Sequence, residues 1–104
     1  MTTYNFTHNG TKINSFTISG HSNFEDLGKD IVCAAVSSAA LMACNTITEI
    51  CNINAKITQD DGFLKLEINN ENLEKSQQIL QGLKLHLDEL AKLYPQHIQG
   101  ENHD

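Results

Sequence analysis

The N-terminal hydrophobic and polar pattern predicts a β-hairpin. Residues 2–8 and 12–18 both alternate loosely between apolar and polar side chains, which is typical of strands with one buried face. Asn9 and Gly10 lie between these two stretches, and an Asn-Gly pair is a strong signal for a tight turn. We therefore expect two antiparallel strands joined by this turn.

A run of small and apolar residues in the middle of the chain predicts a buried helix. Residues 20–29 are polar and bracketed by two glycines, and Asp30 is a suitable N-cap for a helix that continues to about Ile47. This helix is apolar or small around nearly its whole circumference, so it should be buried on more than one side. Because a small sheet covers only one side, the other side needs a second layer, a partner chain, or both.

The second half of the chain repeats the change from strand periodicity to helix periodicity. Residues 53–59 and 63–68 predict two more strands, with a turn at 60–62 between them. Apolar residues then recur at intervals of three and four from 73 to 94, which predicts an amphipathic helix that ends before Pro95.

Together these elements predict the order ββαββα and an α+β fold. The expected architecture is a two-layer sandwich in which helices pack on an antiparallel-rich sheet. A chain of 104 residues is long enough for one domain with one modest core. We therefore expect a single domain over residues 1–104, with a flexible tail at 96–104.

The net charge of −6 narrows the classes of partner. A nucleic-acid-binding protein needs a basic face, so neither nucleic acid nor an anionic membrane is an expected partner, whereas a basic protein or peptide would be attracted. The longest apolar run, residues 31–44, is shorter than the roughly 20 residues that span a bilayer. The N-terminus also has no apolar signal region. We expect a cytoplasmic protein.

The cysteines, at 33, 44 and 51, fit a reducing compartment and free thiols. Cys33 and Cys44 lie too far apart on one expected helix to form a disulfide. Cys44 is expected in the core, and Cys51 is expected to have no special role. Because no Cys and His spacing typical of a zinc site is present, we expect neither a metal nor another cofactor.

Cys33 is the candidate for chemistry. If Asp30 caps the helix, Cys33 is about its third residue, where free N–H groups and the helix dipole favour the thiolate and could form an oxyanion hole. His21 precedes the polar loop, and a folded loop could bring its imidazole to the sulfur, making a nucleophile with its acid–base partner. The alternative is that Cys33 simply fills the core, as cysteines in apolar helices usually do.

Two residues near this pair have two interpretations each. Asp30 is either a helix cap or a third group that orients His21. Ser37 lies one turn after Cys33. It is either a small packing residue whose hydroxyl bonds back to the Cys33 carbonyl, or a direct substrate contact.

The loop at 22–29 is expected to be mobile without substrate. Its apolar residues Phe24 and Leu27 are expected to pack on a bound peptide as the loop closes, and Ser22 and Gly28 belong to the same substrate loop. The alternative is that Phe24 and Leu27 pack into the core.

The sequence from Gly20 onward resembles a known family. "GHS", a polar loop containing glycine, and "DIVCAAVSS" are similar to the signature of the ribosomal-processing cysteine protease (Prp) family, which reads GHA, a glycine-containing loop and DIVCAAVS. The element order, the length and the ending "LAKLYPQHI" are similar as well. By this resemblance His21 and Cys33 match the catalytic histidine and cysteine. Gly20, Asp30 and Ser37 fall on family-typical positions, whereas Ser22 replaces the usual alanine.

The resemblance implies a homodimeric cysteine endopeptidase. Members of the family remove a short N-terminal extension from a large-subunit ribosomal protein of the bL27 type, and such a basic substrate would suit an acidic enzyme. A dimer would also cover the apolar central helix. Two other classes stay open. One is a non-catalytic homodimeric module that binds a ribosomal or assembly partner. The other is a thiol redox protein, which the absence of a resolving Cys-x-x-Cys pair disfavours.

Overall fold

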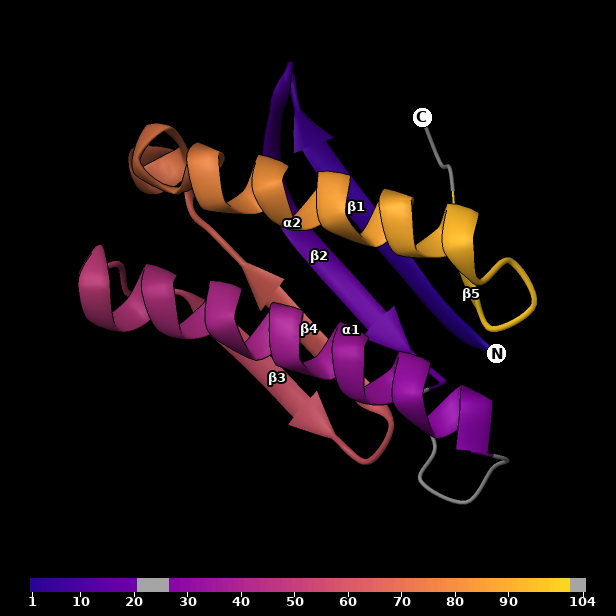
Figure 1. Cartoon of the computed structure of the whole chain (residues 1–104). Coiled ribbons are helices and arrows are strands. Elements are labelled where there is room, and N and C mark those ends of the chain that lie inside the picture. The colour runs from indigo at the N-terminus through magenta and orange to yellow at the C-terminus, as the bar shows by residue number, and fades with distance from the viewer. Residues whose placement is uncertain (21–26, 102–104) are drawn as a thin grey trace.

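The computed structural model describes residues 1–20 and 27–101 and has the predicted α+β fold (Figure 1). Its elements are, in order, β1 (Thr2–Asn9), β2 (Lys12–Ser19), α1 (Leu27–Asn45), the π-helical turn η1 (Thr46–Ile50), β3 (Lys56–Asp60), β4 (Phe63–Glu67), the 3-10 turn η2 (Asn70–Asn72), α2 (Leu73–Leu93) and β5 (Ile98–Glu101).

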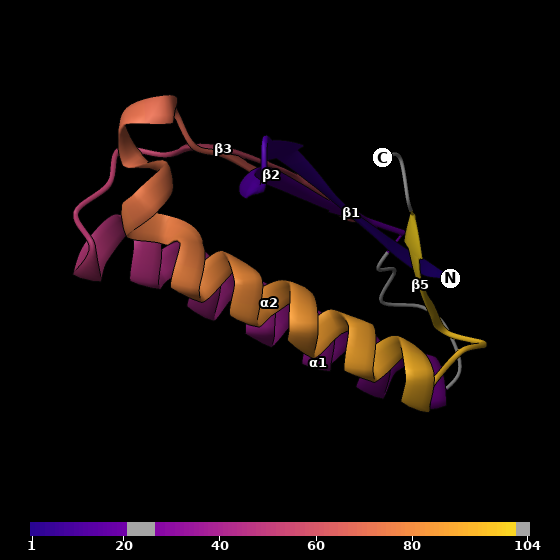
Figure 2. The same ribbon diagram turned by 90° about the horizontal axis from the view of Figure 1, so that it is seen from above.

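The sheet and the two long helices form two layers. Within the described residues the sheet has five strands in the order β3-β4-β2-β1-β5, and every pairing is antiparallel except the parallel pairing of β1 with β5. α1 and α2 lie side by side on the same face of this sheet (Figure 2). The predicted two-layer sandwich with an antiparallel-rich sheet is therefore confirmed.

The predicted N-terminal hairpin forms, but its turn lies one residue later than the predicted Asn9-Gly10 pair. Asn9 pairs with Lys12, so Gly10 and Thr11 make a two-residue turn, and Gly10 has a φ of +66°. A type II′ turn requires positive φ at this first central position, where glycine has no steric penalty. The alternation also holds, because every second side chain of β1 up to Phe6 is buried against the helices.

The core lies between the sheet and the helices. α2 contributes a face at the predicted three-and-four spacing, and α1 contributes Val32, Val36, Ala40 and Ala43, all at most 1% exposed. The buried residues of α2 are Leu73, Ser76, Leu80, Leu83 and Leu87. These two faces meet the inner side chains of β1, β2 and β4, so one continuous core holds both helices to the sheet.

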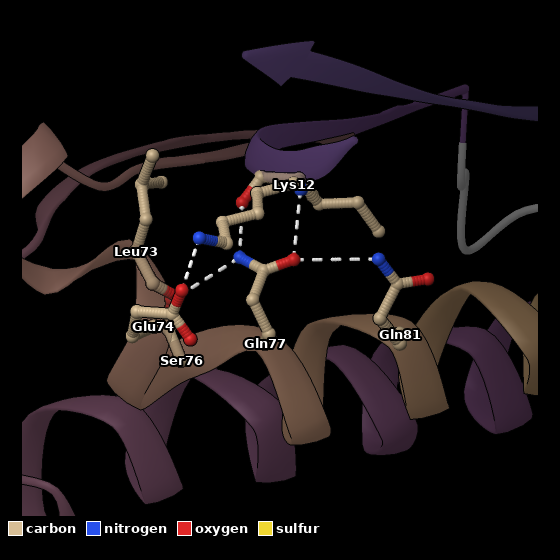
Figure 3. A network of polar contacts seen from close by, with 7 residues as sticks. Lys12, Leu73, Glu74, Ser76, Gln77 and Gln81 are labelled. Carbon is tan, nitrogen blue, oxygen red and sulfur yellow. Dashed lines mark hydrogen bonds and ion pairs between the residues drawn. The ribbon is translucent and has the colours of Figure 1, made fainter. Parts of the chain in front are cut away.

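A hydrogen-bond network fastens the start of α2 to β2 (Figure 3). The side-chain amide of Gln77 accepts a hydrogen bond from the Ile13 N–H at 2.9 Å and donates one to the Ile13 carbonyl at 2.8 Å. The pairing of β2 with β4 covers Ser15–Ser19 and does not reach Ile13, whose backbone groups bond to the helix instead. Gln77 also donates to the Leu73 carbonyl, and Gln81 donates to Gln77. The Gln77 amide thus replaces a neighbouring strand.

The start of α1 differs from the prediction. The helix begins at Leu27, so Asp30 is its fourth residue and not its N-cap. Leu27 and Gly28, which were expected in a mobile substrate loop, belong to the backbone of the helix. No proline interrupts residues 27–29, and each residue added to an existing helix gains a backbone hydrogen bond, so a suitable cap residue alone does not end the helix there.

The end of α1 is also irregular. The α-helix ends at Asn45, slightly before the predicted end, and continues as the π-helical turn η1. Hydroxyls of Thr46 and Thr48 bond back to the carbonyls of Met42 and Cys44, a contact that bends helices. β3 starts at Lys56, later than the predicted residue 53.

The chain after Pro95 is not a frayed tail throughout. Ile98–Glu101 forms β5, in which Ile98 is 1% exposed and pairs with Thr2 of β1. The expectation of a flexible tail over 96–104 is therefore wrong for these residues. The short strand has one buried apolar side chain among polar neighbours, which is too little to produce a strand pattern in the sequence.

The outer face of α1 carries exposed apolar side chains. Ile31 is 58% exposed and Met42 is 54% exposed, and Leu41 is also exposed, as is Ile50 at the end of the following turn η1. By length and composition alone, Ile31–Ile50 is long and apolar enough to cross a membrane, so the sequence estimate based on residues 31–44 was too short. In the structure the inner face of this segment packs in the core, while its outer face is without a covering layer in the described chain.

Candidate active site

Cys33 lies on the inner face of α1, near the end of the sheet where β1 begins. Its side chain is 6% exposed, and its Sγ lies 3.4 Å from the Oγ1 of Thr2. Thr2 is the first residue of β1 and is fully buried. The candidate nucleophile therefore sits at the junction between a helix and a strand, with a hydroxyl as its polar contact.

The helix terminus is not the thiolate stabiliser that the sequence suggested. Cys33 is the seventh residue of α1, whereas the unpaired N–H groups of a helix belong to its first four residues. The effect of the helix dipole also falls off within the first turn. The predicted oxyanion hole of first-turn N–H groups around Cys33 is therefore wrong, because the helix starts one turn earlier than expected.

Gly20 is fixed at the same corner of the molecule. Its φ is +84°, a conformation that side chains rarely adopt, and a Cβ at this position would lie 2.5 Å from the Met1 carbonyl oxygen. Its N–H donates to the Gly62 carbonyl at 2.9 Å. The same Cβ would lie 3.8 Å from the Cα of Thr2, so Gly20 adjoins the residue that contacts Cys33.

Several predicted site residues lie outside the described residues or are placed only through their backbone. His21, Ser22 and Phe24 fall in the first group, so the pairing of His21 with Cys33 stays a prediction. Asp30 is placed inside α1, where the capping role is wrong and the role of orienting His21 stays untested.

Ser37 lies on α1 one turn after Cys33 and is partly buried. A hydrogen bond from its hydroxyl to the Cys33 carbonyl is not found in the described part of the chain, so that expectation is wrong. Its partial exposure leaves the packing and substrate-contact interpretations open.

The other two thiols differ from Cys33 in position and surroundings. All three cysteines are free. Cys44 is 4% exposed within the core, and this burial raises its pKa to about 11, so the thiol stays protonated at neutral pH. Cys51 follows η1 beyond the far end of α1 and is partly buried. The expectation that Cys44 belongs to the core is confirmed.

Thr2 was not predicted from the sequence as a neighbour of Cys33. The signal was present in the alternation of β1, because Thr2 shares its face with Tyr4 and Phe6, both of which are buried. Which helix residue would meet this face depends on how α1 crosses the sheet. That geometry is a property of the tertiary structure and not of the local pattern.

A second polar cluster joins β1 to α2. The Tyr4 hydroxyl donates to Asp88 at 2.5 Å, and Lys84 contacts the other Asp88 oxygen at 2.9 Å. Burial raises the pKa of Tyr4, and the neighbouring Asp88 carboxylate raises it further. Burial also pushes the pKa of Asp88 upward, but the hydrogen bonds from Tyr4 and Lys84 and the nearby lysine charges outweigh it, so the pKa of Asp88 is lowered.

Comparison with known proteins identifies the family. The family model described as "Cysteine protease Prp" matches residues 1–99. A curated relative, the ribosomal processing cysteine protease Prp of Bacillus subtilis (strain 168), is 27% identical over 91 residues, which cover 82% of this chain and 81% of the relative.

Two solved structures of the S. aureus ribosomal processing protease Prp are similar over 97% of this chain and 98% of theirs. The complex with a substrate peptide has a TM-score of 0.88 at 24% identity, which shows the shared fold. The complex with a covalently linked product peptide has a TM-score of 0.84 at 25% identity. With a family model that matches nearly its whole length, this chain belongs to the Prp family of cysteine proteases.

Proposed function

We propose that this chain removes the short N-terminal extension of a large-subunit ribosomal protein of the bL27 type, with Cys33 as nucleophile and His21 as acid–base partner. The observation that carries the proposal is the position of Cys33 on α1, in contact with Thr2 beside Gly20. Gly20, which comes directly before His21 in the sequence, lies at the corner of the fold that holds Cys33.

The relatives of this chain support a ribosomal protein as the substrate. The B. subtilis relative is a ribosomal processing protease, and the S. aureus protease has been solved with a substrate peptide and with a covalently linked product peptide. A covalent peptide adduct is the expected product of attack by a cysteine on a carbonyl carbon. The net charge of −6 further favours the approach of a basic protein such as a ribosomal precursor.

The mechanism follows from the chemistry of the two side chains. The Cys33 thiolate attacks the scissile carbonyl and forms a tetrahedral intermediate, which collapses to a thioester as His21 protonates the leaving amine. His21 then takes a proton from water, which attacks the thioester carbonyl. The second product leaves with a new carboxylate, and Cys33 is regenerated as the thiolate.

We also propose a cytoplasmic homodimer. A groove of about 580 Å³ runs between the two helices, lined by Ala35, Ser38, Ala39 and Met42 of α1 and by Ile79, Gly82, Leu83 and His86 of α2. Together with exposed Ile31 and Leu41, it gives the helical layer an apolar outer surface of the kind that a second copy would cover. Light scattering of the purified chain measures the oligomeric state, and a monomer at micromolar concentration would contradict this part.

The test of function is cleavage of the ribosomal precursor from the same organism. The wild type should release the N-terminal extension by one cut, identified by mass spectrometry of both products. Cys33→Ala and His21→Ala should each reduce kcat/KM by at least about a thousandfold, as loss of a nucleophile or its base does in other proteases.

Cys51→Ala serves as the matched control and should cleave like the wild type, because Cys51 lies beyond the opposite end of α1. A chain that binds the precursor without cutting it would instead fit the non-catalytic binding module, which the low exposure of Cys33 also permits.

A further inference from the structure

Thr2 stands out because a fully buried hydroxyl needs a partner. Its exposed fraction is 0%, and its Oγ1 lies 3.4 Å from the Sγ of Cys33, a normal distance for a hydrogen bond that involves sulfur. Burying a hydroxyl without a hydrogen bond is unfavourable. The sulfur atom of the candidate nucleophile therefore meets this requirement for Thr2.

The backbone holds this hydroxyl in place. The Thr2 N–H donates to the His97 carbonyl at 2.9 Å, and Thr2 pairs with Ile98 of β5. On the other side, Thr3 pairs with Ser19, next to Gly20. Thr2 is thus fixed between two strands, and its β-branched side chain has few rotamers. The strand pairing therefore holds the Thr2 backbone in a position from which its side chain reaches Cys33.

The chemical consequence depends on the ionisation of the sulfur. A hydroxyl can donate or accept, so it can accept from a neutral thiol and donate to a thiolate. Hydrogen bonds to a charged acceptor are roughly twice as strong as neutral ones. A donor fixed beside Sγ therefore stabilises the thiolate more than the thiol. This matters here because Cys33 lies beyond the first turn of α1, where the helix terminus gives little help.

We propose that Thr2 is a positioning residue for the nucleophile, whose buried hydroxyl fixes the Cys33 sulfur and donates a hydrogen bond to it when it is ionised. This inference rests on the proposed function of Cys33 and deepens it. It assigns to strand β1 the stabilising role that the sequence suggested for the start of the helix. It also explains why a polar side chain occupies a fully buried position of β1, in line with Tyr4 and Phe6.

The test compares Thr2→Val with Thr2→Ser and the wild type. Valine keeps the shape and removes the hydroxyl, while serine keeps the hydroxyl. Iodoacetamide modification of Cys33, resolved by peptide mass spectrometry, is followed as a function of pH. In Thr2→Val the half-maximal rate should move up by about one pH unit, which makes modification at pH 7 about tenfold slower. Thr2→Ser should stay within about threefold of the wild type.

Thermal unfolding shows whether each variant is folded. If Thr2→Val is not folded, Thr2→Ala takes its place as the variant without a hydroxyl. A merely structural role for Thr2 would change the unfolding temperature without moving the pH profile. An unchanged profile in the folded variants lacking the hydroxyl would overturn the inference. Because this measurement needs no substrate, failure of the wild type to cut the ribosomal precursor would count against the proposed function alone.

Discussion

At the scale of single residues, the candidate nucleophile is distinguished by its neighbours rather than by its exposure. Cys33 and Cys44 are both buried on α1, yet Cys44 is surrounded by core side chains while Cys33 contacts the Thr2 hydroxyl. The motif around Cys33 made this residue predictable from the sequence. Thr2 was not predictable as its partner, because the two are 31 positions apart and meet only when α1 packs on β1.

The contact between Tyr4 and Asp88 predicts a pH-dependent contribution to stability. The pKa of Asp88 is lowered in the folded state, so folding favours its ionised form. The resulting stabilisation is present at pH values above 3.8, the ordinary pKa of this carboxyl group, and is lost as the pH falls through the lower pKa of the folded state. The raised pKa of Tyr4 means that folding favours its neutral form. This stabilisation is fully present below pH 10 and is lost as the pH rises through the pKa of the folded state.

Asp88→Asn tests this contribution. At pH 7 the variant should unfold with a free energy lower by about 0.5–1 kcal/mol, a small value because the carboxylate is partly exposed. The difference from the wild type should shrink as pH falls below 4. Urea denaturation at several pH values measures it, and a difference that stays constant down to pH 3 would contradict the assignment.

At the scale of elements, the periodic patterns predicted the strands and helices well, and the irregular ends poorly. The helix that ends before Pro95 and the hairpin at Gly10 follow from local chemistry. The start of α1 does not follow from local chemistry, because Asp30 is a good cap residue and yet lies inside the helix. β5 was missed because its place depends on pairing with β1, which no local pattern contains.

Gln77 provides a test at this scale. Gln77→Ala leaves the N–H and carbonyl of Ile13 without their partner on α2, so the free energy of unfolding should fall by about 1–3 kcal/mol. Gln81→Ala is the matched control. Gln81 is exposed, and within residues 1–20 and 27–101 its side chain donates a hydrogen bond to the Gln77 side chain and not to the backbone of β2.

The control should change the free energy of unfolding by no more than about 0.5 kcal/mol. Chemical denaturation followed by circular dichroism separates the two variants. Equal stability of both would show that the Ile13 backbone groups do not depend on Gln77, and it would remove the proposed role of this amide in docking α2.

At the scale of the whole molecule, the layers place the candidate nucleophile at one end of the sheet. The apolar circumference of the central helix predicted burial on more than one side, but in the structure α2 lies beside it and its outer face is exposed. The remaining exposed apolar face is the basis of the proposed dimer. The family model matches residues 1–99, so the family assignment extends over both layers of the fold.

The most direct test of the central claim is the order in which the three cysteines react. Iodoacetamide is added near neutral pH in limiting amount to the folded wild type, and each site is quantified by peptide mass spectrometry. Exposure alone favours Cys51, which is less buried than Cys33 and Cys44. An activated nucleophile instead requires Cys33 to be modified first, and this is the result we predict. Modification of Cys51 ahead of Cys33 would contradict the account.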